Sequence, residues 1–286
     1  DEHNYISIYQ SLMKSRNSDG FRQLANIYLN RRQFKKAVDV LQTFIQFNPG
    51  DKWAKDQLQQ IVGNWGEFVS INPSTEGKKP SFDFRFRNAS KVKFTASRVD
   101  LVKLIRDTKA YINSKPDRLD WNKIQLSHIA NGVLTREKKK YLTGEAESWD
   151  VKLSPAANHF NRRITLQAPV KKAGAWFLEA QIEGGNSSQT YLWIDNTVII
   201  QKRLDNETMI YVADAETGKP VKNTKVNFFG YRQKYIERVK NKPRYEYNIK
   251  EFELNTDVEG KIIFTKGTLD ENHGKRWLIS VNTDSR

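Results

Sequence analysis

Four histidines are the residues best suited to catalysis or metal binding in this sequence of 286 residues: His3, His128, His159 and His273. Zinc sites that use histidine need close spacings such as His-Glu-x-x-His, which put two ligands on one helix face. The four histidines lie far apart and fall in different expected elements. The sequence also has no Gly-x-Ser-x-Gly elbow, P-loop or Gly-x-Gly-x-x-Gly turn. We therefore predict no catalytic, cofactor-binding or metal-binding residues, and no enzyme activity.

Cysteine is absent from the chain, which excludes disulfides, zinc–thiolate sites and thiol nucleophiles within it. The loop Asp257–Gly260 could be interpreted as a cation site. It lacks the series of oxygen ligands that calcium needs, so we predict a β-turn there. Asn88, Asn186 and Asn206 begin glycosylation sequons, which matter only if the source glycosylates its exported proteins.

The chain is strongly basic, with a net charge of +15 and an isoelectric point near 9.7. Such a charge favours anionic partners, namely nucleic acid, a membrane surface or an acidic glycan. Most basic residues are scattered, so we predict a solvated basic surface and no nucleic-acid partner. The segment Tyr231–Tyr247 (YRQKYIERVKNKPRYEY) is the best candidate for nucleic-acid or glycan contact. We favour the alternative, a solvated hairpin loop whose tyrosines lie on the domain. The sequence has no apolar run of about 18 residues, so we predict no transmembrane segment in it.

The first ~70 residues have helical periodicity. The apolar face of one expected helix is formed by Phe21, Leu24, Ala25 and Tyr28. A second helix carries Ala37 and Leu41 and ends at Asn48-Pro49-Gly50, and a third is expected from about Asp51 to Val62. These residues resemble one tetratricopeptide unit, with Phe21 where that pattern has Trp. The resemblance implies a groove for peptide binding or another protein–protein contact. The other interpretation is a helical hairpin packed on its neighbour.

After a polar linker from Asn72 to Pro80, the period changes to that of β-strands. Phe82, Phe84 and Phe86 alternate with polar residues, and further strands are expected up to Val198–Ile200. We predict a helical insertion between strands from Val99 to Tyr141. Trp176 and Phe177 are neighbours in one expected strand and cannot both enter one core. One of them is therefore expected to face a neighbouring element.

Two turn phrases mark the last part of the chain: VADAETGKPVKNTKV (Val212–Val226) and NTDVEGKIIF (Asn255–Phe264). Glycine and proline supply the backbone angles of a tight turn, so both phrases predict hairpins of one sandwich. The predicted fold class is multidomain α + β, a tetratricopeptide-like helical hairpin followed by two antiparallel, immunoglobulin-like β-sandwiches. The predicted domains are residues 1–75, 76–203 and 204–286, with the two sandwiches meeting near Leu204.

An ordered set of segments resembles two consecutive macroglobulin-type domains of bacterial α2-macroglobulin-like proteins. These segments are FRFRNASKVKFTASRVDL (Phe84–Leu101), ESWDVKLS (Glu147–Ser154), APVKKAGAWFLEAQI (Ala168–Ile182), YLWIDNTVIIQK (Tyr191–Lys202) and the two turn phrases. The helical front end departs from the domain pattern usual for that family. The set covers ~200 residues. We expect the chain to be a piece of a longer protein, because it opens at Asp1 without Met and ends soon after the strand-like WLISV.

The resemblance implies a large protease-trapping protein, which closes around a protease that has cut its bait segment. Many such proteins also capture the protease through a Cys-x-Glu-Gln thioester, and this sequence has no such motif. The implied role is a non-catalytic scaffold portion of a periplasmic, cell-envelope or extracellular inhibitor, with proteases as partners of the full-length protein. One alternative is a cell-surface adhesion or glycan-binding protein built from sandwich modules and a helical repeat. A nucleic-acid-binding protein is a third, suggested only by charge.

Overall fold

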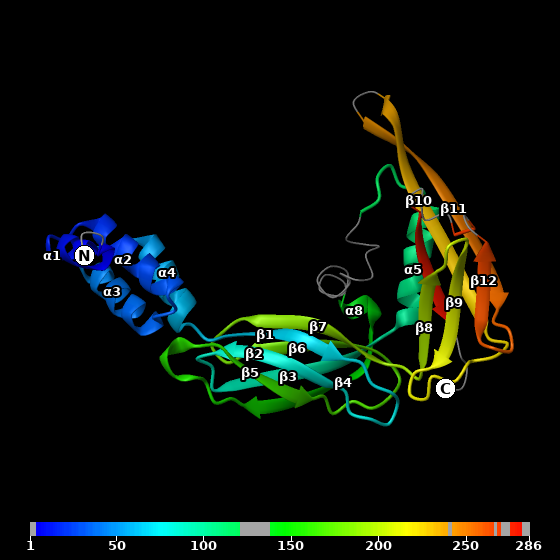
Figure 1. Ribbon diagram of the computed structural model, residues 1–286, viewed down its shortest axis with the longest axis horizontal. Helices are drawn as coiled ribbons and strands as arrows, with labels where there is room; N and C mark the ends of the chain where they lie inside the picture. The colour runs from blue at the N-terminus through cyan, green and yellow to red at the C-terminus, as the bar shows by residue number, and fades with distance from the viewer. Residues whose placement is uncertain (1–3, 121–137, 240–241, 266–267, 270–274, 282–286) are drawn as a thin grey trace.

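The computed structural model describes residues 4–120, 138–239, 242–265, 268–269 and 275–281 (Figure 1). It begins with helices α1 (Tyr5–Lys14), α2 (Ser18–Asn30), α3 (Phe34–Phe47) and α4 (Lys52–Val62). Side chains satisfy the free backbone N–H groups at several helix starts. The Asn17 carboxamide accepts from the Asp19 and Gly20 amides of α2, and the Asp51 carboxylate accepts from the Ala54 amide of α4.

The helical core is formed mainly where α2 meets α3. The rings of Phe21 and Phe44 stack with their centroids 5.0 Å apart, and both are almost completely buried. Ala25 and Ala37 are fully buried and are small enough to let the two helices approach closely. The apolar spacing in the sequence therefore predicted the buried face of these helices.

The first sandwich consists of two antiparallel sheets. One has the strand order β1-β2-β5 and the other β4-β3-β6-β7. Their bounds are β1 Trp65–Asn72, β2 Ser81–Arg87, β3 Lys91–Val99, β4 Leu142–Lys152, β5 Arg162–Gln167, β6 Gly174–Ile182 and β7 Ser187–Ile194. Phe82, Phe84 and Phe86 of β2 are fully buried between the sheets, because alternate side chains of a strand point to one face. Phe94 of β3 packs edge to face on Phe82 and Phe84.

The second sandwich is also built from two antiparallel sheets, of strand order β12-β9-β8 and β11-β10-β13. The strands are β8 Thr197–Arg203, β9 Glu207–Asp214, β10 Lys225–Val239, β11 Lys242–Asn255, β12 Lys261–Thr265 and β13 Arg276–Val281. Phe228 stacks on Phe252 at 5.0 Å, and Phe264 meets both rings edge to face. The predicted fold class, helices followed by two antiparallel β-sandwiches, is confirmed.

Two segments differ from the sequence expectation. Residues 65–72 fall in the region predicted to be helical, yet they form β1, which pairs with β2. Residues 197–203, expected in the first sandwich, form β8 and pair with β9 of the second. The chain thus passes between the sandwiches at Asp195 and Asn196, whereas Leu204 lies in the β8–β9 turn. The division of the chain into domains stays a prediction.

Between β3 and β4 the chain forms helix α5 (Leu101–Asn113) and the short helix α8 (Lys138–Tyr141). These confirm the predicted helical insertion at its two ends, and its centre, with Trp121, Ile124 and Ile129, lies outside the described residues. Trp176 is in the main core of the first sandwich, whereas Phe177 lies on the opposite sheet face with Leu104 of α5. The prediction that one of these two aromatic residues faces a neighbouring element is confirmed.

Candidate functional site

The two turn phrases of the sequence meet in the second sandwich. The Asp214 carboxylate accepts hydrogen bonds from the Glu216 and Thr217 amides and from the Thr217 hydroxyl, which fixes the first turn. In the second turn Gly260 has a φ of +74°, and an added Cβ there would lie 2.8 Å from Pro220 Cβ. The Gly260 carbonyl accepts from the Val212 amide at 2.8 Å. Both turns are therefore parts of one packed structure.

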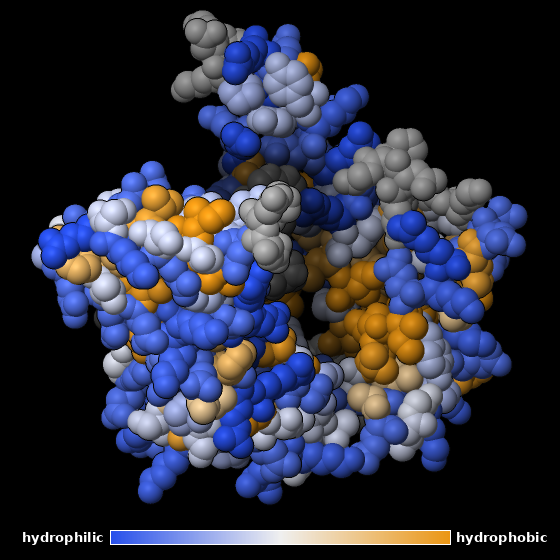
Figure 2. Space-filling model, turned by 60° about the vertical axis from the view of Figure 1, so that its left-hand side comes forward, coloured by the Kyte–Doolittle hydropathy of each residue, from blue (hydrophilic) through white to orange (hydrophobic). Residues whose placement is uncertain are grey.

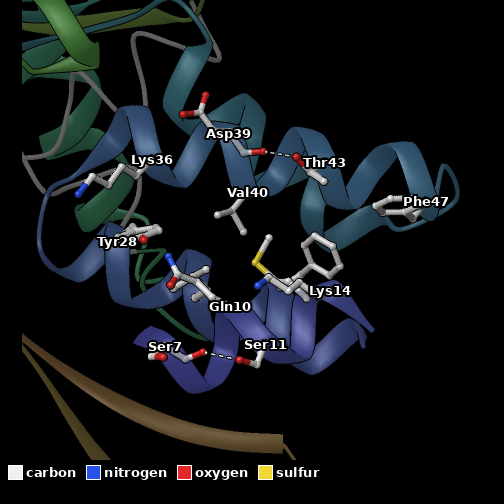
Figure 3. Close-up of a pocket in the computed structure, with 13 residues that line it drawn as sticks. Ser7, Gln10, Ser11, Lys14, Tyr28, Lys36, Asp39, Val40, Thr43 and Phe47 are labelled. Carbon is white, nitrogen blue, oxygen red and sulfur yellow. Dashed lines mark hydrogen bonds between the residues drawn. The ribbon is translucent and has the colours of Figure 1, made fainter. Parts of the chain in front are cut away.

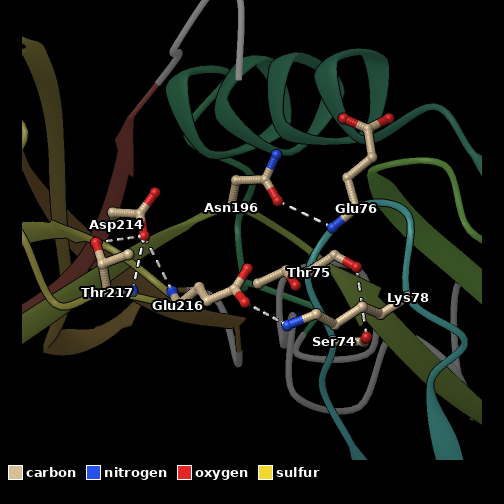
Figure 4. A network of polar contacts seen from close by, with 8 residues as sticks. All are labelled: Ser74, Thr75, Glu76, Lys78, Asn196, Asp214, Glu216 and Thr217. Carbon is tan, nitrogen blue, oxygen red and sulfur yellow. Dashed lines mark hydrogen bonds and ion pairs between the residues drawn. The ribbon is translucent and has the colours of Figure 1, made fainter.

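The first of these turns also contacts the β1–β2 linker of the first sandwich (Figure 4). Lys78 Nζ lies 2.5 Å from Glu216 Oε1, and the Glu76 amide donates to Asn196 Oδ1 at 2.9 Å. Asn196 lies between the sandwiches, and its carbonyl accepts from the Ala215 amide at 2.8 Å. The Lys78–Glu216 pair is exposed, so it orients the junction more than it stabilises it.

Helix α5 makes the larger connection between the sandwiches. Its first turns pack on the outer face of the first sandwich, where Leu104 and Val99 contact Phe177 and Ala175. Ile112 near the end of α5, and Leu119 in the segment that follows the helix, pack on Phe229 and Tyr231 of β10 in the second sandwich. One insertion of the first sandwich therefore covers part of both outer sheets (Figure 1).

Polar contacts accompany this packing. Lys109 Nζ is 2.6 Å from Asn227 Oδ1 and 2.7 Å from Glu251 Oε1, and its side chain is only 18% exposed. The Tyr247 hydroxyl donates to the Pro116 carbonyl. Lys109 is therefore held by hydrogen bonds to charged and polar partners on two strands of the second sandwich.

Hydrogen bonds and burial shift the pKa values of several titratable groups around α5. Lys140 beside Asp107 holds the pKa of that carboxyl below its usual range. Hydrogen bonds to Tyr141 and Asp107 raise the pKa of Lys140, and burial raises the pKa values of Tyr141 and Tyr231. All of these shifts lead away from neutrality, whereas a general acid or base needs a pKa near the working pH.

The helical region carries an open groove of about 570 Å³ (Figure 3). Helix α2 contributes Phe21, Leu24 and Tyr28, and α1 and α3 supply polar residues on both sides. The other residues that line the groove are Ser7, Gln10, Ser11, Met13, Lys14, Lys36, Asp39, Val40, Thr43 and Phe47. The groove is open and is lined by polar and apolar residues in about equal measure, which suits a peptide more than a small apolar substrate.

The helical region is joined to the end of the first sandwich by Asn88. Its side-chain amide donates to the carbonyls of Ile61 and Gly63 at 2.8 and 3.0 Å, and its Oδ1 lies 2.9 Å from His159 Nδ1. Phe34 of α3 meets Phe160 edge to face at 5.2 Å. His159 is therefore a structural residue, and His3, His128 and His273 lie outside the described residues.

The remaining sequence candidates are also placed by the structure. Asp257–Gly260 forms a turn, in which Asp257 Oδ1 accepts from the Glu259 and Lys261 amides. Among the described residues no group of three or more His, Asp or Glu side chains could hold a metal ion. Nor does any described helix have both the length and the apolar character needed to cross a membrane.

The described residues of the basic segment, 231–239 and 242–247, form the outer part of the long β10–β11 hairpin and are strand, where we expected a hairpin loop. Tyr231 is buried against α5, whereas Tyr235 is 53% exposed. Only part of the tyrosine set lies on the domain. The sequence showed the basic and aromatic composition but not this division between packed and exposed tyrosines.

Comparisons with known proteins identify no family for this chain. No family model matches the sequence, and no curated protein matches it. Among solved structures, the fragment of native alpha-2-macroglobulin from Escherichia coli spanning domains MG0-NIE-MG1 aligns with a TM-score of 0.45 and 14% identity. The alignment covers 78% of this chain and 62% of that fragment, so this chain spans less than two thirds of it.

A shorter fragment of the same Escherichia coli protein, spanning domains NIE-MG1, aligns with a TM-score of 0.43 and 13% identity. This alignment covers 72% of this chain and 89% of the fragment. The native conformation of the Escherichia coli protein gives a TM-score of 0.36 at 15% identity, over 78% of this chain and 12% of that one. Values this low establish neither membership of that family nor a function.

Proposed function

We propose that this chain is a non-catalytic scaffold portion of a bacterial α2-macroglobulin-like, protease-trapping inhibitor. The observation that carries the scaffold role is the double attachment of α5, which packs on the outer sheets of both sandwiches. A scaffold needs fixed relations between domains, and buried apolar contacts on both sides of one helix supply them. The ordered sequence segments that resemble macroglobulin-type domains support the choice of family.

The proposal assigns proteases as partners of the longer protein and a periplasmic, cell-envelope or extracellular location. It also assigns protein–protein contact to the tetratricopeptide-like helical region, supported by the open groove beside α2. The chain alone has no cysteine for covalent capture. Two sandwiches and a helical region are also too small to enclose a protease.

A protease assay tests the scaffold role. The purified chain is incubated with several endoproteases, and each is then assayed on a large protein substrate and on a small peptide. We expect the chain neither to hydrolyse the substrates nor to protect either of them. Selective protection of the large substrate would mean that the chain traps by itself, and protection of both would mean an active-site inhibitor. Either result contradicts the scaffold role.

The family assignment needs a separate experiment on the longer natural protein. We expect that protein to protect the large substrate and spare the small one after a protease has cut it once. A variant of it with Ile112→Asp, which puts a charge into the buried contact of α5, should lose this protection more than the exposed change Val102→Asp on the same helix. Equal protection by both variants would contradict the role given to α5.

A further inference from the structure

The β10–β11 hairpin extends beyond the sheet to which it belongs. Within the part of the chain that the structure describes, β13 pairs with β10 only over Val226–Tyr231, so from Arg232 outward the described hairpin is a two-stranded ribbon. We call its described residues, 232–238 and 243–248, the arm. It rises above the rest of the second sandwich in Figure 1 and forms the narrow lobe at the top of Figure 2. A lone two-stranded ribbon is only marginally stable in water, so its exposed end gains by contact with a partner.

The base of the arm is held by hydrogen bonds, whereas large side chains of its outer part are exposed. Gln233 donates to the Tyr247 hydroxyl at 2.7 Å, and that hydroxyl donates to Pro116 beyond α5. Farther out, Tyr235 and Ile236 are 53% and 49% exposed. Ile236 is the extra residue of a β-bulge, which interrupts the pairing between Tyr235 and Glu237.

One face of the outer arm is aromatic. Tyr235 pairs across the ribbon with Tyr245. Pro243, the partner of Arg238, lies on the same face as Tyr245, because side chains two residues apart in a strand point to one face. The two tyrosine rings meet edge to face with centroids 5.8 Å apart. A tyrosine ring has an apolar body and a polar hydroxyl, and is suited to the boundary between water and hydrocarbon.

The opposite face of the arm is nearly neutral by itself. Lys234 pairs with Glu246 across the ribbon, and Arg244 Nη1 lies 3.2 Å from Glu237 Oε1. Arg232 on this face pairs with the uncharged Asn248, whereas Arg238 lies on the aromatic face and pairs with Pro243. Between Arg232 and Asn248 the sequence has six basic and two acidic residues, so the segment has an excess of positive charge.

We propose that the arm docks on the surface of an anionic lipid bilayer. Tyr235, Ile236 and Tyr245 enter the headgroup layer, and the unmatched arginines are attracted to the anionic headgroups. Nucleic acid is the weaker fit. Tyr235 and Ile236 are the exposed large apolar side chains of the arm, and isoleucine has no ring face on which a base could stack.

Vesicle flotation of the full chain tests this proposal. The chain is mixed with vesicles of phosphatidylglycerol and phosphatidylcholine, or of phosphatidylcholine alone, at low and physiological salt. We expect binding to the anionic vesicles only, weaker at the higher salt. Arg238→Glu should lower the partition coefficient by about fivefold or more. Tyr235→Ser combined with Ile236→Ser should lower it by about tenfold.

Matched variants keep the result interpretable. The control variants Lys202→Glu on β8 and Ile263→Ser on β12 change an exposed basic residue and an exposed apolar residue on the other sheet of the second sandwich, and should leave binding unchanged. If the double variant does not fold, Ile236→Ser alone replaces it, because that side chain is exposed. The proposal is overturned if the chain does not bind anionic vesicles at low salt, or if the arm and control variants bind alike. It is also overturned if single-stranded nucleic acid binds more tightly than the vesicles and the arm variants abolish that binding.

Discussion

At the scale of single residues, Asp83 is the carboxylate most strongly held by its surroundings. It accepts hydrogen bonds from Arg163, and from the Ser70 and Thr165 hydroxyls at 2.6 Å each. The hydrogen bond from Arg163 is the main reason why the pKa of this carboxyl lies far below its usual range. A carboxyl whose folded pKa is depressed adds stability above its unfolded pKa of about 3.9, and this stability is lost as the pH falls toward the folded pKa.

The prediction from Asp83 is a change in acid sensitivity. Asp83→Asn should lower stability at neutral pH and should flatten its decline below about pH 4, because the titrating group is gone. Denaturant unfolding at a series of pH values measures both effects. Asp150→Asn is the control, since its carboxylate is exposed and pairs with Lys91 at the surface. Equal pH profiles for wild type and Asp83→Asn would show that the network does not act on folding.

The three sequons also give a prediction at residue scale. The side-chain amide of Asn88 donates hydrogen bonds to the carbonyls of Ile61 and Gly63, and that of Asn186 donates to the Gly66 carbonyl at 2.9 Å. Asn206 is exposed in the β8–β9 turn. When the chain is secreted from a host that glycosylates, we expect a glycan at Asn206 alone. Peptide mass spectrometry checks this, and a glycan at Asn88 or Asn186 in folded protein would contradict the packing described.

At the scale of elements, α5 gives the sharpest prediction. Ile112 is 1% exposed and contacts the second sandwich, so Ile112→Ala should destabilise the protein by about 2–5 kcal/mol through the cavity it leaves. Val102 on the same helix is 77% exposed, and Val102→Ala should change stability by less than about 0.5 kcal/mol. Denaturant unfolding followed by circular dichroism measures both. A small effect at Ile112 would mean that α5 is not packed on the second sandwich.

Elements also show what the sequence could and could not predict. The alternation of Phe82, Phe84 and Phe86 predicted a half-buried strand, because nothing interrupts its period of two. Strand β1 was missed because a bulge between Phe68 and Ser70 breaks that period. Helical spacing predicted α5, but the sheet on which Ile112 packs is decided by contacts between residues more than 100 positions apart in the sequence. Spacing within one segment carries no information about such contacts.

At the scale of the whole molecule, the two sandwiches are expected to unfold as one cooperative unit. Strand β6 in the first and β10 in the second are connected through α5, with further contacts where Lys78 meets Glu216. Buried contacts that cross a domain boundary transmit the stability of one domain to the other. Amide hydrogen exchange should therefore give similar protection for the buried parts of β6 and β10 in the wild type.

The combined change Lys109→Ala and Ile112→Asp should separate the two sandwiches. It removes the hydrogen bonds to Asn227 and Glu251 and buries a charge against Phe229, so the contact of α5 with the second sandwich becomes unfavourable. We expect protection of β10 to fall by about tenfold or more while β6, whose contact through Leu104 is intact, changes little.

Small-angle scattering of the same variant should show a larger radius of gyration, because the exposed junction at Lys78 and Glu216 is too weak to hold the sandwiches together by itself. An equal loss of protection in both strands would show that α5 stabilises the first sandwich as much as the second. Unchanged protection and size would show that the sandwiches are held by contacts other than α5.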